Sequence, residues 1–427
     1  MPGADPSDVG TASAALQTGN GEKMNGEKMN GSSENGSGMV MGGVDLTTMS
    51  RLIKLPAAGA NPDVRPSNLM PVIPPQLMGS MLANGFQSGT QFGSGYVVQG
   101  WVTDKIHTYP ATYYIESVSV SPNDPDIYKY TIRTLHPQPD GGQDCNIDVC
   151  PMVWEYGCGS RTVFVRTATG STSFVVPYQA TAVGGQWNYQ QGVPGGGRKV
   201  IEQDSPDYDT KITFACDNGA IGKCVENMGY KPWAMGPNEC KYVCTTLHDL
   251  PSCRKVCVQH TLELMHEACV RMVRADYCGN GTPHTVTGVS IDEWDNANIQ
   301  TETSISTNPS DHFGKEAEWT PNGARCLSQA NMGRLDDDVT MTRLDTYLNM
   351  TCPDKWPNSS WGNNDCFDVK GSTPSTYYFG NVPTTSFDWH DRVFLRNTSM
   401  CVHDFDYTTG TFETNTHFVM PPCKAQN

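Results

Sequence analysis

The chain has 427 residues, a hydrophobic content of 37% and a formal net charge of -16. This charge would repel nucleic-acid phosphates and anionic lipid headgroups, so the composition argues against nucleic-acid binding. No run of about 18 apolar residues is present, which argues against a transmembrane helix, and the N-terminus lacks the basic start and apolar stretch of a secretory signal peptide.

The cysteines are the strongest compositional signal. Cytosolic glutathione keeps thiols reduced, whereas exported proteins use disulfides where apolar burial is thin. We therefore expect an extracellular, cell-surface or periplasmic protein, although no export signal is visible in this chain. All sixteen cysteines are disulfide candidates: Cys145, Cys150, Cys158, Cys216, Cys224, Cys240, Cys244, Cys253, Cys257, Cys269, Cys278, Cys326, Cys352, Cys366, Cys401 and Cys423.

The first ninety residues are expected to carry little regular structure. Residues 1–60 are dominated by Gly, Asn, Ser, Glu and Met, with too little apolar surface to offset the entropy of ordering. They are predicted to form a disordered leader. Residues 61–91 are rich in proline and are predicted to lie extended on the fold.

Residues 92–184 are predicted to form a strand-rich domain. Short β-type runs are separated by turns such as Pro122–Pro125. In one run, Tyr128, Tyr130 and Ile132 alternate with polar residues, which predicts one buried face and one solvent-exposed face. An antiparallel sheet or a small sandwich is expected.

Between residues 240 and 257 the cysteine spacing predicts helices rather than strands. Cys240 and Cys244, and likewise Cys253 and Cys257, are four positions apart, about one helical turn. This pattern predicts two facing helices joined by two disulfides. The alternative is a zinc ion held by the four thiolates, although structural zinc sites more often have two residues between the cysteines of each pair.

A long core helix is predicted next, ending at Gly279-Asn280-Gly281 because glycine adopts the left-handed cap without a steric clash. The same spacing places Asp276 on its buried face, at the negative end of the helix dipole. We expect a compensating partner, with Arg274, Arg325 or a metal as candidates, and a structural anchor as the simplest role. The apolar stripe of this helix comprises Val258, Leu262, Met265, Cys269 and Met272.

The segment Arg274–Thr285 resembles the signature of the ADYC domain family, through Ala275-Asp276-Tyr277-Cys278. The resemblance covers at least residues 185–330, and the segment from Cys240 to Cys257 looks like an insertion. It implies a bacterial, exported protein of an uncharacterised family, and it supplies no catalytic residue. Further blocks that carry it are Gly185–Tyr189, Phe214–Cys216, Gly219–Cys224, Gly229–Trp233, Ile291-Asp292 and Trp319–Cys326.

Most reaction motifs are absent from the sequence. His266-Glu267 begins like a zincin helix, but Val270 occupies the position of the second histidine ligand. Neither a Gly-x-Ser-x-Gly nucleophile elbow nor a phosphate-binding loop is present. His266 and Cys269 share a helix face and could act as a metal pair or a nucleophile-base pair, but a core cysteine beside a half-exposed histidine is the simpler interpretation. The acidic run Asp336–Asp338 is predicted to start a helix rather than to bind calcium.

One cluster remains as a candidate site. The Gly-rich turn after the core helix could bring Asp276 and His284 together as a general acid-base pair, with Tyr277, Asp292 and Asp295 as candidate binding residues. The alternative interpretation is that Tyr277 and His284 only anchor the loop through hydrogen bonds.

Residues 351–427 are predicted to form an extension rich in cysteine and aromatic residues. Cys352, Cys366, Cys401 and Cys423 suffice for two bridges, and the aromatic side chains suit either a small core or contact with a carbohydrate or protein.

Together these patterns predict an α+β protein. A strand-rich antiparallel domain, residues 92–184, would precede a disulfide-stapled, partly helical ADYC-like domain, residues 185–350, and the extension. The function expected is that of an exported or cell-surface structural or binding module with a protein or carbohydrate ligand, no metal and no cofactor. The alternative is a secreted hydrolase that uses Asp276 and His284.

Overall fold

The computed structural model describes a large part of the chain from residue 40 to residue 412. The described residues are 40–57, 60–83, 92–103, 108–137, 151–167, 170–187, 196–201, 205–247, 250–283, 291–295, 299, 313–327, 352, 378–379, 382–383, 395–400, 405–406 and 411–412.

The fold is β-rich, so the predicted α+β class is wrong. Within the described residues the helical structure consists of α3 (Ala220–Glu226), α4 (Glu263–Arg274) and a 3-10 turn, η2 (Pro66–Asn68), whereas strands recur between residues 40 and 412. None of these helices is long and apolar enough to cross a membrane.

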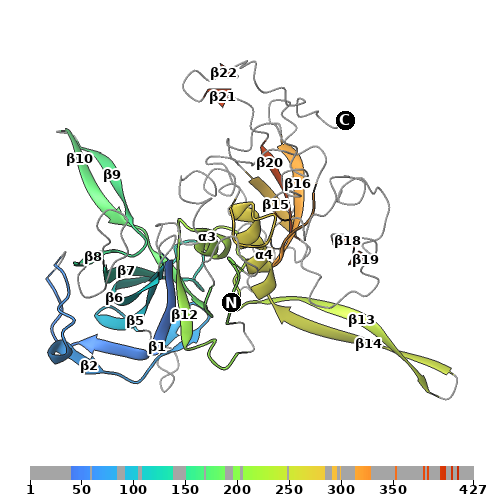
Figure 1. Cartoon of the computed structure of the whole chain (residues 1–427), viewed down its shortest axis with the longest axis horizontal. Helices are drawn as coiled ribbons and strands as arrows, with labels where there is room; N and C mark the ends of the chain where they lie inside the picture. The colour runs from blue at the N-terminus through green and yellow to red at the C-terminus, as the bar shows by residue number, and fades with distance from the viewer. Residues whose placement is uncertain are drawn as a thin grey trace, which may run out of the picture.

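A closed antiparallel barrel forms the N-terminal half of the structure (Figure 1). Its strands follow the order β11-β12-β1-β5-β6-β7, and the pairing of β7 with β11, through Tyr130 and Ala180, closes the ring. Two further strands extend it at β1 and β7, namely β2 (Leu69–Pro71) and β8 (Met152–Tyr156). The barrel strands are β1 (Val40–Leu52), β5 (Tyr96–Thr103), β6 (Thr108–Val120), β7 (Tyr128–Pro137), β11 (Ala180–Gly184) and β12 (Lys211–Cys216).

Strand β1 corrects the predicted leader. Residues 40–52, expected to be disordered, lie between β5 and β12 in the barrel, while residues 1–39 lie outside the described residues. Register shifts between Met41 and Val44 and between Asp45 and Ser50 interrupt the two-residue alternation of this strand. Because such bulges break the period of two, the sequence pattern does not indicate a strand here.

Aromatic side chains fill the barrel interior. The Phe214 ring lies 5.6 Å from the Tyr130 ring and 6.3 Å from the Tyr113 ring, between centroids. The predicted solvent-exposed face of β7 is wrong, because Lys129, Thr131 and Arg133 are also buried. Other parts of the chain cover that face, and they supply partners for its polar side chains.

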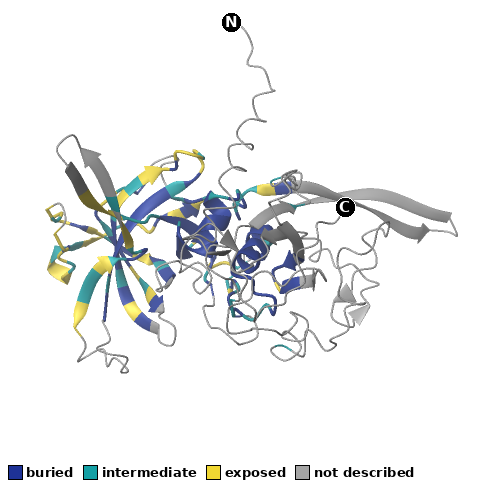
Figure 2. Cartoon of the chain, turned by 90° about the horizontal axis from the view of Figure 1, so that it is seen from above, coloured by how far each residue is buried: buried dark blue, intermediate teal, exposed yellow. Residues whose placement is uncertain are grey.

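A second core surrounds the two helices (Figure 2). In it, α3 packs on α4, and α4 packs against a four-stranded antiparallel sheet with the order β15-β20-β16-β17. Strand β20 comes from the stretch predicted as a separate C-terminal extension, so that stretch contributes to this sheet. The sheet strands are β15 (Ile291–Asp295), β16 (Phe313–Thr320), β17 (Gly323–Leu327) and β20 (Leu395–Met400).

The segment predicted as two cysteine-bearing helices is a β-hairpin, so that prediction is wrong. Strands β13 (Met235–Leu247) and β14 (Leu250–Thr261) pair antiparallel and project from the body (Figure 1). A spacing of four residues is even, so it also places cysteines on one face of a strand. The many β-branched residues of this segment, such as Val243 and Val256, favour the strand.

A second hairpin projects from the barrel, formed by β9 (Ser160–Thr167) and β10 (Gly170–Pro177) (Figure 1). The remaining strands are short pairs: β3 (Gln76–Met78) with β4 (Met81–Ala83), β18 (Tyr378–Phe379) with β19 (Val382–Pro383), and β21 (Phe405–Asp406) with β22 (Thr411–Phe412).

Candidate functional site

The candidate site begins where α4 ends. Ala275 adopts the left-handed conformation with φ 52°, and its N–H donates to the carbonyls of Arg271 and Met272. Among the described residues it is the one non-glycine residue with positive φ. This conformation costs an L-residue roughly 1–2 kcal/mol, so the surroundings must hold it in place.

The Asp276 side chain stabilises this left-handed conformation. Its side chain is fully buried, and its Oδ2 forms an ion pair with the guanidinium of Arg271. Oδ2 also accepts the N–H of Gly281 at 2.8 Å, while Oδ1 accepts those of Gly279 at 2.8 Å and Asn280 at 3.2 Å. A carboxylate has about four acceptor positions, and these four donors occupy them. No acceptor position is left for abstracting a proton from a substrate.

Arg271 connects the carboxylate to two other segments. Its Nε donates to the carbonyl of Pro321 at 2.9 Å, and its Nη1 donates to that of Gly196 at 2.7 Å. The ion-pair partner of Asp276 is therefore Arg271, which the sequence analysis did not name, while the side chain of the candidate Arg325 lies outside the described residues. Arg274 instead donates to the carbonyl of Gly281, on the far side of the same turn.

The next two residues of the tetrad also bind the loop to the body. The buried Tyr277 ring packs on Trp319 of β16, with 5.2 Å between centroids, and its carbonyl accepts the N–H of Ala324 at 3.2 Å. Cys278 forms a disulfide with Cys352. Each residue from 275 to 278 thus has a defined structural contact.

Gly279 is needed at its position for a steric reason. Its φ is 69°, and a Cβ there would overlap the backbone carbonyl of Asn322. The turn and the β16–β17 connection therefore approach each other more closely than any side chain would permit.

Of the predicted site residues, Asp276, Tyr277 and Asp295 have side chains that the structure describes. Asp295 accepts hydrogen bonds from the Tyr230 hydroxyl at 2.9 Å and from the N–H of Ile299 at 3.2 Å, which are different partners from those of Asp276. Asp292 lies on β15 opposite Thr398 of β20. His284 lies outside the described residues, as does the acidic run Asp336–Asp338.

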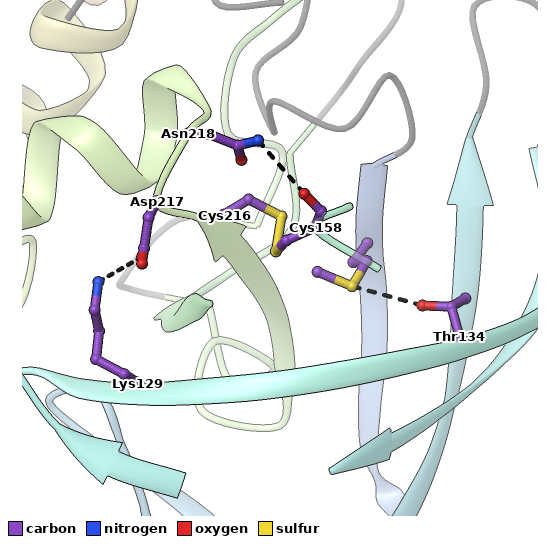
Figure 3. The surroundings of a disulfide bond; sticks show 7 residues. Lys129, Thr134, Cys158, Cys216, Asp217 and Asn218 are labelled. Carbon is purple, nitrogen blue, oxygen red and sulfur yellow. Dashed lines mark hydrogen bonds and ion pairs between the residues drawn. A yellow bond between two sulfur atoms is a disulfide. The ribbon is translucent and has the colours of Figure 1, made fainter. Parts of the chain in front are cut away.

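Three disulfides are seen in the described part of the chain. Besides Cys278–Cys352, Cys224 of α3 is bonded to Cys269 of α4, and Cys158 is bonded to Cys216 at the end of β12. Cys269 is therefore a bridge residue, not a nucleophile or metal ligand. Figure 3 shows the Cys158–Cys216 bridge, where the Asn218 side chain also donates to the Cys158 carbonyl.

An ionic network joins the barrel to α3. The buried Lys129 ammonium of β7 lies 2.5 Å from Asp217 Oδ1 and 3.3 Å from Glu226 Oε2 (Figure 3 shows the first pair). The Ser121 hydroxyl donates to the other Glu226 oxygen at 2.7 Å. This network supplies partners for the buried charge of Lys129, so the ammonium can lie on a covered face of β7.

A second buried charge cluster lies along the first turns of α4, and sequence motifs did not identify it. Lys199 Nζ contacts Glu263 Oε1 at 2.7 Å and lies over the Trp187 and Tyr208 rings. Glu267 Oε2 is 3.7 Å from Arg198 Nε, and burial raises the Glu267 pKa to about 7.

His266 was expected to be half-exposed, but it is fully buried. Its Nε2 is 3.0 Å from the Ile221 carbonyl of α3, and its ring packs edge-on against Trp187. Burial lowers its pKa to about 3, so Nε2 of the neutral ring carries the proton and donates it to that carbonyl. The residue connects the two helices. Among the described residues, no group of three or more His, Cys, Asp or Glu side chains could hold a metal ion.

Comparison with known proteins identifies the family. No curated protein and no solved structure matches this chain. The model of the ADYC domain matches residues 99–333, more than half of the 427 residues, and it includes most of the barrel as well as both helices. The match therefore extends well before residue 185, where the resemblance in sequence began. The chain belongs to the ADYC domain family.

Proposed function

We propose that this protein is an exported or cell-surface module of bacterial origin whose role is structural or ligand-binding, and whose ADYC residues stabilise the fold. The observation that carries this proposal is the saturation of Asp276. Its two oxygens accept four hydrogen bonds from Arg271 and three backbone amides. A general base must have an acceptor position free for the proton that it removes.

The disulfides support an oxidising compartment. Two of the three described bridges, Cys224–Cys269 and Cys278–Cys352, lie in or beside the second core and connect segments 45 and 74 residues apart. Bridges that close long loops of this kind are typical of exported proteins. Thiol titration tests this part of the proposal. Protein secreted into an oxidising periplasm should have Cys224 and Cys269 protected from alkylation in denaturant, and reactive thiols at both positions would contradict it.

An exposed apolar surface supports a binding role. Phe174 and Val176 lie on one face of β10 and Val175 on the other, and these three side chains are 53%, 38% and 65% exposed, respectively. Residues 160–177 also contain two arginines and no carboxylate in a chain of net charge -16. A protein ligand with an acidic rim around an apolar patch would complement this hairpin.

The competing hypothesis is a secreted hydrolase that uses Asp276 and His284. Chromogenic p-nitrophenyl esters and glycosides can be offered to the purified oxidised protein and to its H284A and D276N variants. We expect wild-type protein to hydrolyse them no faster than buffer does. Turnover by wild-type protein that is lost in folded H284A would contradict the structural proposal and support catalysis.

A further inference from the structure

The β13–β14 hairpin places its four cysteines in two facing pairs. The backbone register sets Cys240 opposite Cys257 and Cys244 opposite Cys253. Each strand therefore carries its two cysteines four positions apart, on the same face. The sequence predicted two disulfides between these segments, but it placed them on facing helices and did not fix which cysteines pair.

This register permits disulfides only between directly opposite cysteines and excludes the other two pairings of the four. Directly opposite residues of antiparallel strands have Cα atoms about 4.5 or 5.5 Å apart, and both values fall within the range of about 4.4–6.8 Å that disulfides span. The bridges Cys158–Cys216 and Cys224–Cys269 have Cα separations of 5.4 and 5.9 Å. Cysteines four positions apart on one strand are about 13 Å apart, and diagonal pairs are at least as far.

The same separation argues against zinc. A tetrahedral site needs four sulfurs about 2.3 Å from one ion. Two rungs about 13 Å apart along the hairpin cannot place their sulfurs around a single ion. The zinc alternative for these four cysteines is therefore incompatible with the hairpin.

We propose that Cys240–Cys257 and Cys244–Cys253 form two cross-strand disulfides, a ladder that stiffens the projecting β13–β14 arm. Each rung forms when two thiols together lose two protons and two electrons, and the disulfide of a thiol-disulfide oxidoreductase accepts them and becomes a dithiol. An isolated two-stranded hairpin is marginally stable in water. The rungs would hold this arm in one shape where it lies away from the body (Figure 1).

The tryptic sites in the sequence make the Cys244–Cys253 rung directly testable. Lys241 separates Cys240 from Cys244, and Arg254 and Lys255 separate Cys253 from Cys257. Cleavage therefore yields a peptide, residues 242–254, that contains Cys244 and Cys253 alone. The experiment alkylates the secreted full-length protein with N-ethylmaleimide, denatures it, digests it without reductant, and identifies the peptides by mass spectrometry.

The proposal predicts that peptide 242–254 is released unlinked, carries an internal disulfide, and takes up alkylating reagent only after reduction. Covalent attachment of this peptide to the Cys240 or Cys257 peptide would overturn the pairing. Alkylation of Cys244 and Cys253 before reduction would overturn the ladder, even if Cys224–Cys269 is intact in the same digest. That internal comparison separates failure of the ladder from failure of the proposed compartment.

A variant pair tests whether the rungs stiffen the arm. In C244S/C253S, native trypsin should cut at Lys241 and Arg254 about tenfold faster than in wild-type protein, because cleavage follows the population of the opened hairpin. The thermal midpoint of the body should be unchanged. S252A, a substitution beside the rung, is the matched control and should be cut at the wild-type rate. Equal cleavage of all three proteins would contradict the stiffening role.

Discussion

Arg271 and Asp276 form a buried ion pair across the end of α4, five positions apart in the chain. The pair exists because Ala275 turns the backbone left-handed, which brings the carboxylate back beneath the last helical turn. Arg271 then bonds the carbonyls of Gly196 and Pro321, so one guanidinium joins three segments.

Removing the carboxylate should destabilise the fold strongly. Asp276→Ala leaves the Arg271 guanidinium buried without its partner, and we expect the free energy of unfolding to fall by about 3–5 kcal/mol. Urea denaturation of the oxidised protein measures this free energy of unfolding. Asp209→Ala, at an exposed carboxylate, is the control and should change stability by less than about 0.5 kcal/mol. Equal stability of the two variants would contradict the anchoring role.

Two small residues of the turn after α4 should differ in how far substitution lowers the free energy of unfolding. Ala275→Gly relieves the left-handed strain but removes a buried methyl group, so we expect a change within about 1 kcal/mol. Gly279→Ala forces a Cβ into the Asn322 carbonyl, and it should destabilise the protein by about 2–3 kcal/mol. Thermal unfolding of both variants provides the comparison. Tolerance of Gly279→Ala would show that the turn does not lie against the β16–β17 connection.

Stability should depend on pH through Glu267. Burial raises its folded pKa from 4.5 to about 7, so in this window the folded state binds more protons than the unfolded state. The free energy of unfolding therefore falls as the pH rises from about 4.5 through 7. Glu267→Gln removes this dependence and should be more stable than wild type at pH 8 by about 1–3 kcal/mol, with little difference at pH 4.5.

Denaturation curves of both proteins across that pH range test the prediction. Other titrating groups, including His266, contribute to both proteins and cancel in the difference. A stability difference that stays constant from pH 4.5 to 8, or that shrinks as the pH rises, would contradict a buried ionised Glu267.

The disulfide that joins α3 to α4 should contribute substantially to the free energy of unfolding. Cys224 and Cys269 are 45 positions apart, and closing such a loop stabilises a fold by about 4 kcal/mol in the chain-entropy model. The C224S/C269S variant should lose stability of this order in non-reducing urea denaturation. A variant as stable as wild type would show that packing of α3 on α4 holds the second core without the bridge.

Local patterns in the sequence predicted some of these features well. Met265, Cys269 and Met272 of the predicted apolar stripe lie on the core helix α4, whereas Val258 of the same stripe lies on β14. The predicted end is wrong: α4 stops at Arg274, and the left-handed cap is Ala275, not a glycine of the 279–281 turn. A buried carboxylate at Asp276 with an arginine or backbone anchor was expected on the same grounds. The sequence did not identify Arg271 as that arginine, because the left-handed turn at Ala275 reverses the chain direction and brings Asp276 next to Arg271.

Long-range pairing explains the features that the sequence could not predict. Strand β1 carries bulges, and its partner β12 is far along the chain, so no local period marks it. The cysteine spacing of the β13–β14 hairpin fits one face of a helix or of a strand, and only the partner strand decides between them. Likewise β20 completes a sheet whose other strands precede it by many residues.

A double-mutant cycle between Arg271 and Asp276 tests most directly whether the ADYC residues hold the fold together. The free energy of unfolding would be measured for wild type, Arg271→Met, Asp276→Asn and the double variant, all oxidised. We predict a coupling energy of about 2 kcal/mol or more, with the double variant less destabilised than the sum of the single variants. Additive effects within about 0.5 kcal/mol would contradict a structural ion pair at this position.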